Sequence, residues 1–510
     1  MSRPLARRSL AMLVCTHVLL AACTAQALSP IPQPTVWPEP RPQPLPQPSR
    51  PQQPSAVHPL PPALFAPDFQ APSAQNCRRP IQTREVPGRE AGWRQESEAS
   101  ARSDRSHGYA AREKLASPAP APAAPVATAR SPRAEAKSSA VAEDSFSPAA
   151  GSVAMEPARQ TLQRRPAPVT AGMVDDNADF SAYLDFRGRN RVEHRARDVS
   201  ERYQLLVKDR AGRAVADAEV AVRSPQGAAM WARTDTGGRV WVHPNAFDPS
   251  RSSVYEVSVR QGGQEARGFL RRGQKSAVDI TLSSTPLPAR AQLDLVFLID
   301  ATGSMADEID KLKTSLAGIA NEVARLPSQP DLCFGMVAYR DKGDAFLLRS
   351  HDFTNDLSAF QKVLNALRAD GGGDTPEAMN EALNETVHNL SWRGDGTTRL
   401  VVLLADAPPH LDYGGPQYDN DMLAALGKGI KVFSVGASGL DRQGEYIQRQ
   451  IAQYTGGRFV FLTYADASKP SSGPGRETSH DVSGYSVDTL DRLIVKLVRD
   501  ELARLPVHTQ

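Results

Sequence analysis

Short stretches in the middle of the chain alternate apolar and polar residues and are separated by glycine-containing turns. "RYQLLVKDRAGRAVADAEVAVRS", "MWARTDTGGRVWVHP", "VYEVSVRQGG" and "SAVDITL" show this pattern in succession. Alternation with a period of two predicts strands that bury one face, and several such strands joined by turns predict a small β-sandwich. We place this domain at residues 180–288.

From Gln292 onward the strand candidates are apolar on both faces and alternate with helices. The strands are "LDLVFLI", "DLCFGMVAY", "RLVVLLA" and "IKVFSVGA". After Ser304, apolar residues recur at steps of three and four from Ile309 to Leu326, which predicts a helix. Further helices are predicted in "DLSAFQKVLNALRAD", "TPEAMNEALNETVHNL" and "SVDTLDRLIVKLVRDELARL". This order predicts a doubly wound, Rossmann-like α/β domain at residues 290–510.

Neither pattern extends over the first part of the chain. Many of the 42 prolines fall in residues 23–72, which predicts an extended, hydrated tether. Residues 73–179 are rich in Ala, Ser, Arg, Glu and Pro without sustained periodicity, so we predict a disordered linker there. The 510 residues are therefore expected to form a multidomain chain with a disordered, proline-rich N-terminal region.

The first 22 residues have the features of a secretory signal. Basic residues precede an apolar stretch, residues 10–22, that is too short to span a membrane comfortably. The sequence "LAAC", residues 20–23, resembles a bacterial lipobox, which implies lipidation of Cys23 and an anchor in the cell envelope. The residue after the cysteine is Thr24 rather than aspartate, which by the same resemblance favours the outer membrane. Ordinary cleavage after "AQA", residues 25–27, is the alternative and would give a secreted protein.

Net charge and cysteine content bear on three kinds of function: nucleic-acid binding, disulfide formation and zinc binding. A formal charge of +3 over the whole chain gives no indication of nucleic-acid binding. Of the four cysteines, Cys77 and Cys333 remain outside the signal. A disulfide between them is possible in an oxidising compartment, but the apolar surroundings of Cys333 favour a buried free thiol. The spacing of the cysteines does not fit a zinc site.

Oxygen-bearing side chains follow the predicted strand ends of the α/β domain. Asp300 ends one strand and is followed by Thr302 and Ser304, Asp406 follows another strand, and Thr375 lies in the loop "GGGDTPEAM". Ligands of open α/β sheets bind beyond the carboxyl ends of the strands, so we expect these five residues to meet. Two adjacent carboxylates repel each other, and a hard divalent cation resolves that conflict. An all-oxygen ligand set favours Mg²⁺, or Mn²⁺ or Ca²⁺.

This arrangement resembles the von Willebrand factor type A (VWA) domain and its metal-ion-dependent adhesion site. The family motif Asp-x-Ser-x-Ser reads Asp300-Ala301-Thr302-Gly303-Ser304 here, with threonine in place of the first serine. The resemblance implies that Thr302 and Ser304 bind the metal directly and Thr375 directly or through water. It implies that Asp300 and Asp406 act largely through water. It also implies a non-enzymatic module that captures an acidic side chain of a protein partner.

A second resemblance concerns the preceding domain. The stretches "VKDRAGRAVADAEVAV" and "TDTGGRV" are similar to carboxypeptidase-regulatory-like domains, which implies a spacer or scaffold.

Other interpretations of these residues stay open at this point. In one alternative, Asp300, Thr302 or Ser304 only caps the following helix. A phosphatase of the haloacid-dehalogenase type would also place an aspartate at a strand end, but it needs a second acid where Thr302 stands. A structural envelope spacer with a non-functional metal site is a third interpretation. His410 is expected to be a surface loop residue, and "RGD", residues 393–395, a chance tripeptide.

Overall fold

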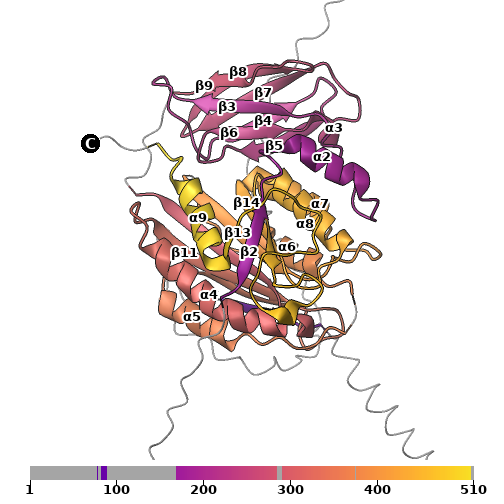
Figure 1. Ribbon diagram of the computed structural model, residues 1–510. Helices are drawn as coiled ribbons and strands as arrows, with labels where there is room; N and C mark the ends of the chain where they lie inside the picture. Colours follow the sequence, from indigo (N-terminus) through magenta and orange to yellow (C-terminus); the bar gives the residue numbers. More distant parts are fainter. Residues whose placement is uncertain are drawn as a thin grey trace, which may run out of the picture. The chain divides into compact units, whose positions relative to one another are not determined.

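The computed structural model describes residue 77 and residues 82–88, 168–283, 290–373, 375–394 and 396–506 (Figure 1). The predicted signal, Cys23 and the tether lie outside these ranges. All described residues belong to one compact unit, Gln53–Gln510. Within them, no helix combines the length and apolar character that crossing a membrane requires.

A nine-stranded mixed sheet forms the centre of the α/β domain, in the order β1-β12-β11-β10-β13-β14-β15-β2-β16. Five neighbouring strands, β11, β10, β13, β14 and β15, run parallel to one another, and the outer strands are antiparallel to their neighbours. The strands are β1 (Thr83–Val86), β2 (Thr170–Val174), β10 (Gln292–Asp300), β11 (Asp331–Tyr339), β12 (Leu348–Thr354), β13 (Thr397–Ala405), β14 (Ile430–Gly436), β15 (Phe459–Thr463) and β16 (Val487–Thr489). The prediction of an α/β domain with a central sheet is confirmed.

Helices cover both faces of this sheet (Figure 1). On one face Leu295 and Phe297 of β10 share a buried cluster with α4, α5 and α9, while Val296 and Leu298 share another with α6, α7 and α8 on the opposite face. Successive side chains of a strand point to opposite faces, so a strand covered on both sides is apolar throughout. The helices are α4 (Ala306–Ala324), α5 (Leu357–Ala366), α6 (Met379–His388), α7 (Tyr418–Lys428), α8 (Arg442–Tyr454) and α9 (Leu490–Leu502).

Residues 203–281 form two small sheets with a common core, here called the two-sheet domain. One sheet has the order β6-β3-β9 and the other β5-β4-β7-β8. Their strands are β3 (Tyr203–Lys208), β4 (Glu219–Arg223), β5 (Ala229–Arg233), β6 (Arg239–Val242), β7 (Val254–Gln261), β8 (Gln264–Arg271) and β9 (Val278–Thr281), with α3 (Pro244–Phe247) between β6 and β7. Buried residues from both sheets, among them Leu205, Val220 and Val257, belong to one cluster. The relation to carboxypeptidase-regulatory-like domains stays a prediction.

The linker predicted at residues 73–179 is not structureless throughout. β1 pairs with β12, and β2 lies between β15 and β16 in the large sheet. α2 (Phe180–Arg189) also packs on the α/β domain, because Tyr183 and Phe186 share a cluster with Tyr446 and Tyr454. These strands have only four and five residues, so their alternation is too brief to show in the sequence. Backbone pairing with a distant strand supplies the order that local propensity does not.

Cys333 is not a free thiol, which corrects the sequence-based expectation. It forms a disulfide with Cys77, with the two Cα atoms 6.0 Å apart, within the usual range for a disulfide. The bond joins residues 256 positions apart and holds the segment before β1 against β11. No pattern near Cys77 predicts this approach, because the partner strand is brought there only by the folded sheet.

A fragment that begins at residue 290 is expected to fold poorly, because it lacks β1 and β2. Removing β2 leaves the hydrogen-bonding groups of β15 and β16 without the partner strand that pairs with both. We expect aggregation or a broad thermal transition for residues 290–510. A fragment that begins at residue 168 should unfold more sharply, since it restores β2. Equal, cooperative calorimetric transitions for both fragments would contradict this assignment.

Candidate metal centre

The Asp300 loop forms the first part of the predicted site. Asp300 is fully buried at the end of β10, and its Oδ1 accepts hydrogen bonds from the Thr302 backbone N–H at 3.0 Å and the Thr302 hydroxyl at 2.7 Å. The hydroxyl oxygens of Thr302 and Ser304 are 3.2 Å apart. α4 begins after Met305, which is its N-cap and makes no side-chain capping bond. The three predicted side chains therefore lie together, and none of them caps α4.

Asp406 meets this loop because β13 is the parallel neighbour of β10. Ile299 and Leu404 are paired in register, so Asp300 and Asp406 follow at adjacent strand ends. Asp406 is 8% exposed, and the neighbouring Ser304 hydroxyl favours its ionised form. Oδ2 of Asp300 and Oδ1 of Asp406 are buried and have no hydrogen-bond partner among the described residues. Each carboxylate thus presents an oxygen without a hydrogen-bond partner among the described residues, and the buried hydroxyl of Tyr339 is the polar group beside that of Asp300.

The glycine loop lies directly against these residues. The backbone N–H of Gly303 donates to the carbonyl of Gly371 at 3.0 Å, and that of Asp370 donates to Ala301 at 3.1 Å. Gly372 has a φ of +68°, and a Cβ there would lie 3.1 Å from Cβ of Thr302. Glycine is needed at this position because it permits both the left-handed backbone and the close approach.

Thr375 is the predicted ligand that the structure does not join to the others. It is exposed, and none of the hydrogen bonds among the described residues links its side chain to the remaining four. Nor does it cap the following helix, because α6 begins at Met379 with Ala378 as its N-cap. The backbone N–H groups of Glu377 and Ala378 instead donate to the carbonyls of Pro408 and Arg340. These bonds hold residues 375–377 outside the helix.

Glu377 is a site residue that the sequence analysis missed. It is 2% exposed, and its Oε2 has no hydrogen-bond partner among the described residues. Its Oε1 lies 3.1 Å from the position of a Cβ on Gly372, which places it beside the Thr302 loop. The residue stands within "GGGDTPEAM", and a glutamate in that loop was the available signal. The sequence predicts a helix from Thr375 onward, with Glu377 in its first turn. Acidic residues are common there because they interact favourably with the helix dipole, so Glu377 did not stand out as a ligand.

Negative charge accumulates at this edge of the sheet. Burial, and then the neighbouring Asp406, raise the pKa of Asp300 from 3.8 to about 7. Burial raises the pKa of Asp406, and burial together with Asp300 raises that of Glu377 to about 9. Like charges in a desolvated site disfavour ionisation. Carboxylate and hydroxyl oxygens with unsatisfied lone pairs fit a hard divalent cation such as Mg²⁺, which would hold these acids ionised.

The metal-free protein is expected to lose stability as the pH rises toward 7. The folded-state pKa of Asp300 is raised, so its stabilising contribution is complete below about pH 4 and is lost as the pH rises through about 7. Mg²⁺ competes with the bound proton, so Mg²⁺ affinity should increase over the same interval.

Melting temperatures from about pH 5 to pH 8, with chelator and with Mg²⁺, test this expectation. Subtracting the profile of Asp300→Asn removes the contribution of distant titrating groups and leaves that of Asp300 together with its effect on Asp406 and Glu377. A pH profile that is identical in the wild type and this variant would contradict it.

Two other sequence features have structural roles. Arg393 of the RGD tripeptide is 9% exposed and donates to Asp294 at 2.6 Å and to Asp331 at 2.8 Å. It compensates the buried charge of Asp294 and is not available to a receptor, while Asp395 lies outside the described residues. The side chain of His410 is 15% exposed, and its Nε2 lies 2.9 Å from Oδ1 of Asp341. His410 is therefore more buried than expected for a surface loop residue.

A further group of candidate ligand atoms does not form a metal site. Atoms of Cys77, Asp294 and Cys333 lie within 4.8 Å of one another. The two cysteines are bonded to each other and Asp294 is paired with Arg393, so neither thiolates nor a spare carboxylate remain.

Comparison with known proteins identifies the α/β domain. Residues 294–409 match the family model described as the von Willebrand factor A domain. This span begins in β10 and ends just beyond Asp406, so it contains the Asp300 loop, the glycine loop and the end of β13. The chain therefore contains a VWA domain.

Three curated relatives are similar to parts of the chain. "Alpha-protein kinase vwkA" of Dictyostelium discoideum is 29% identical over 27% of this chain and 22% of its own length. "von Willebrand factor A domain-containing protein 7" of Rattus norvegicus is 30% identical over 26% of this chain and 13% of its own length. "Integrin beta-4" of Homo sapiens is 22% identical over 42% and 12%. The chain thus spans less than a quarter of the length of these relatives.

Proposed function

We propose that this chain is a non-enzymatic, divalent-metal-dependent protein-binding module of a bacterial cell-envelope lipoprotein. The observation that carries the proposal is the pair of buried carboxylates at adjacent strand ends. Asp300 and Asp406 each keep an oxygen without a hydrogen-bond partner among the described residues, beside the hydroxyls of Thr302 and Ser304. A buried charge without a partner is costly, and a bound Mg²⁺, Mn²⁺ or Ca²⁺ removes that cost.

The partner is proposed to present an acidic side chain to the metal. Ser304 and Thr375 are exposed, whereas Asp300 and Thr302 are buried. The buried residues at the sheet edge would therefore contact the cation on one side, and its other side would be open to solvent. Hydroxyl ligands add no negative charge, so the ion keeps its attraction for an external carboxylate. The match to the VWA family and the similarity to integrin β-chains support an adhesion-type role.

The envelope location rests on different observations. Because residues 20–23 resemble a lipobox, we propose a lipid anchor at Cys23. The proline-rich tether would then hold the VWA domain away from the outer membrane. The Cys77–Cys333 disulfide supports an oxidising compartment, since disulfides persist outside the cytosol. In this proposal the two-sheet domain acts as a scaffold for the α/β domain that carries the metal site.

Capture of partners from an envelope extract tests the proposal. The immobilised full-length chain is incubated with extract in Mg²⁺ or in chelator, beside the variant Asp300→Asn. Retention of the same protein in Mg²⁺ only, and by the wild type only, is the expected result. Blocking the acids of that protein by carbodiimide coupling should prevent its capture.

Binding that persists in chelator and in Asp300→Asn would favour the spacer interpretation, with a non-functional metal site. Metal-dependent turnover of phosphate esters by the purified chain would instead favour the hydrolase interpretation.

A further inference from the structure

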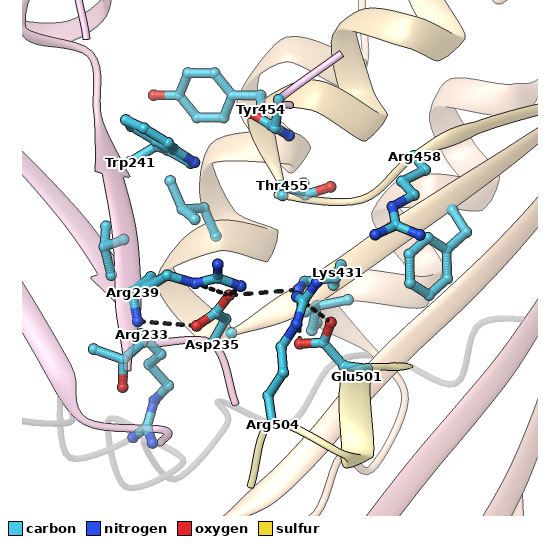
Figure 2. A pocket seen from close by; sticks show the side chains of 18 of the residues that line it. Arg233, Asp235, Arg239, Trp241, Lys431, Tyr454, Thr455, Arg458, Glu501 and Arg504 are labelled. Atoms are coloured by element: carbon cyan, nitrogen blue, oxygen red, sulfur yellow. Dashed lines mark hydrogen bonds and ion pairs between the residues drawn. The ribbon is translucent and has the colours of Figure 1, made fainter. Parts of the chain in front are cut away.

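A cavity separate from the metal centre lies between the two-sheet domain and the α/β domain. Its volume is about 470 Å³, and it is lined by β6, by β14 and by the ends of α8 and α9. This volume is typical of small-molecule sites, which often lie between domains. Figure 2 shows the head groups of Arg239, Arg458 and Arg504 turned toward the same space, beside Lys431.

Of the four acidic residues of the cavity wall, Asp235, Glu501 and Asp175 accept hydrogen bonds at both oxygens, whereas among the described residues Asp500 accepts only at Oδ2, from Lys496. Oδ1 of Asp235 accepts two backbone N–H groups, and its Oδ2 accepts Arg239. Oε1 of Glu501 accepts Thr236 at 2.9 Å and Lys431 at 2.7 Å, and its Oε2 accepts Arg504. Both carboxylates therefore have little remaining capacity to bind a ligand cation.

The arginines of the wall keep unused donors. A guanidinium carries five N–H donors. Arg458 donates from Nε to Asp175 at 2.8 Å, and its nearest other acid is Asp500, 3.9 Å from Nη1. Among the described residues, Arg504 donates only from Nη1, to Glu501, and Arg239 donates only to Asp235 through its side chain. Both Arg458 and Arg504 are partly exposed, at 18% and 34%.

We propose that this cavity binds a small molecule that carries phosphate or carboxylate oxygens. Spare guanidinium donors from three segments of the chain face one space, while Asp235 and Glu501 beside them are already satisfied, so an acceptor-rich anion complements the wall. Arginine forks match the planar geometry of carboxylates and the oxygens of phosphates. The side chain of Trp241 lines the same cavity and offers an apolar surface beside the charged one (Figure 2).

Calorimetric titration of the full-length chain with inorganic phosphate, pyrophosphate and citrate tests this site. The protein is first freed of divalent metal on a chelating resin, so that the Asp300 centre does not contribute, and ionic strength is matched with chloride. Saturable binding of at least one of the three anions is expected. The variants R458Q and R504Q should each weaken it by about tenfold or more, as expected for loss of a charge-assisted hydrogen bond.

The matched control is R492Q, an arginine of α9 that is 71% exposed, pairs with Asp488 and lies outside the cavity. It should bind as the wild type does. Arg504 lies beyond the last residue of α9, so the R504Q variant is expected to keep the wild-type fold. A circular dichroism spectrum equal to that of the wild type would verify this. Absence of saturable binding for all three anions, or an equal loss in R492Q, would overturn the proposal. Because metal is removed throughout, failure here leaves the metal-centre proposal untouched.

Discussion

Asp300→Asn is expected to abolish saturable Mg²⁺ binding and at the same time to raise the melting temperature of the metal-free protein. The amide keeps the shape of the side chain, and its oxygen still accepts the hydrogen bond from the Thr302 backbone N–H. It removes a buried negative charge next to Asp406, the origin of the raised pKa of Asp300. A single substitution thus has opposite effects on metal binding and on metal-free stability.

Calorimetric titration of Mg²⁺ and Mn²⁺ into the full-length chain measures the first effect. We expect a loss of affinity of about 100-fold or more, at or above the upper end for a residue that acts through water, because Asp300 also supplies a buried negative charge. Thermal unfolding in chelator at about pH 8 measures the second, at about 2–4 °C for each kcal/mol gained. Asp310→Asn is the matched control, because Asp310 is 79% exposed and paired with Lys313 on the same helix. Mg²⁺ affinity that is unchanged in Asp300→Asn would remove Asp300 from the site.

The second large effect is expected at the ion pair that joins the two-sheet domain to β13. Asp217 accepts from Arg399 at 2.8 Å and from the Gly396 backbone N–H at 2.6 Å, and the side chains of Asp217 and Arg399 are only 7% and 5% exposed. Asp217→Ala leaves the Arg399 guanidinium buried without this partner, removes the ion pair of Asp217 with Arg233, and places alanine at a φ of 57°. We expect the free energy of unfolding to fall by about 3–5 kcal/mol.

Chemical denaturation of the full-length chain measures this loss. Asp279→Ala provides the control, because it removes the ion pair of Asp279 with Lys208 within the two-sheet domain. The side chains of Lys208 and Asp279 are 43% and 60% exposed, respectively. An exposed pair contributes about 0–1 kcal/mol, so this variant should unfold nearly as the wild type does. If Asp217→Ala were as stable as Asp279→Ala, the two domains would not be held together by this pair.

β13 connects these two predictions physically. It begins near Arg399, which is paired with the two-sheet domain, and it is followed by Asp406 at the metal centre. Mg²⁺ titration of Asp217→Ala should therefore accompany its denaturation, and Mg²⁺ affinity is expected to be unchanged under conditions in which the variant remains folded.

Much of the α/β domain could be predicted from the sequence because its signals are local. The strands β10, β11, β13 and β14 are continuous apolar runs, and α4 has a regular apolar face. An apolar run must be covered on both sides, so the alternation of strands and helices already determines that the sheet is central. The same logic brought Asp300 and Asp406 to one edge, since parallel strands end on the same side.

Residues whose place depends on distant partners could not be predicted in this way. β1 and β2 are short, and Cys77 has no local feature that points to Cys333. Glu377 was assigned to a helix because its propensity is helical, whereas the backbone bond from its N–H to Pro408 keeps it outside α6. In each case a long-range contact outweighs local preference.

By itself, the sequence determined the class of the fold, the strand ends that carry the acids, and the type of ion that they suit, because periodicity and ligand chemistry are properties of short segments. Only the tertiary structure decided that Glu377 joins Asp300 and Asp406, that Thr375 stays exposed, and that Cys77 meets Cys333. Only the tertiary structure placed Arg239, Arg458 and Arg504 around one cavity. These features arise where segments far apart in the chain are packed together, and burial there decides which charges need a partner.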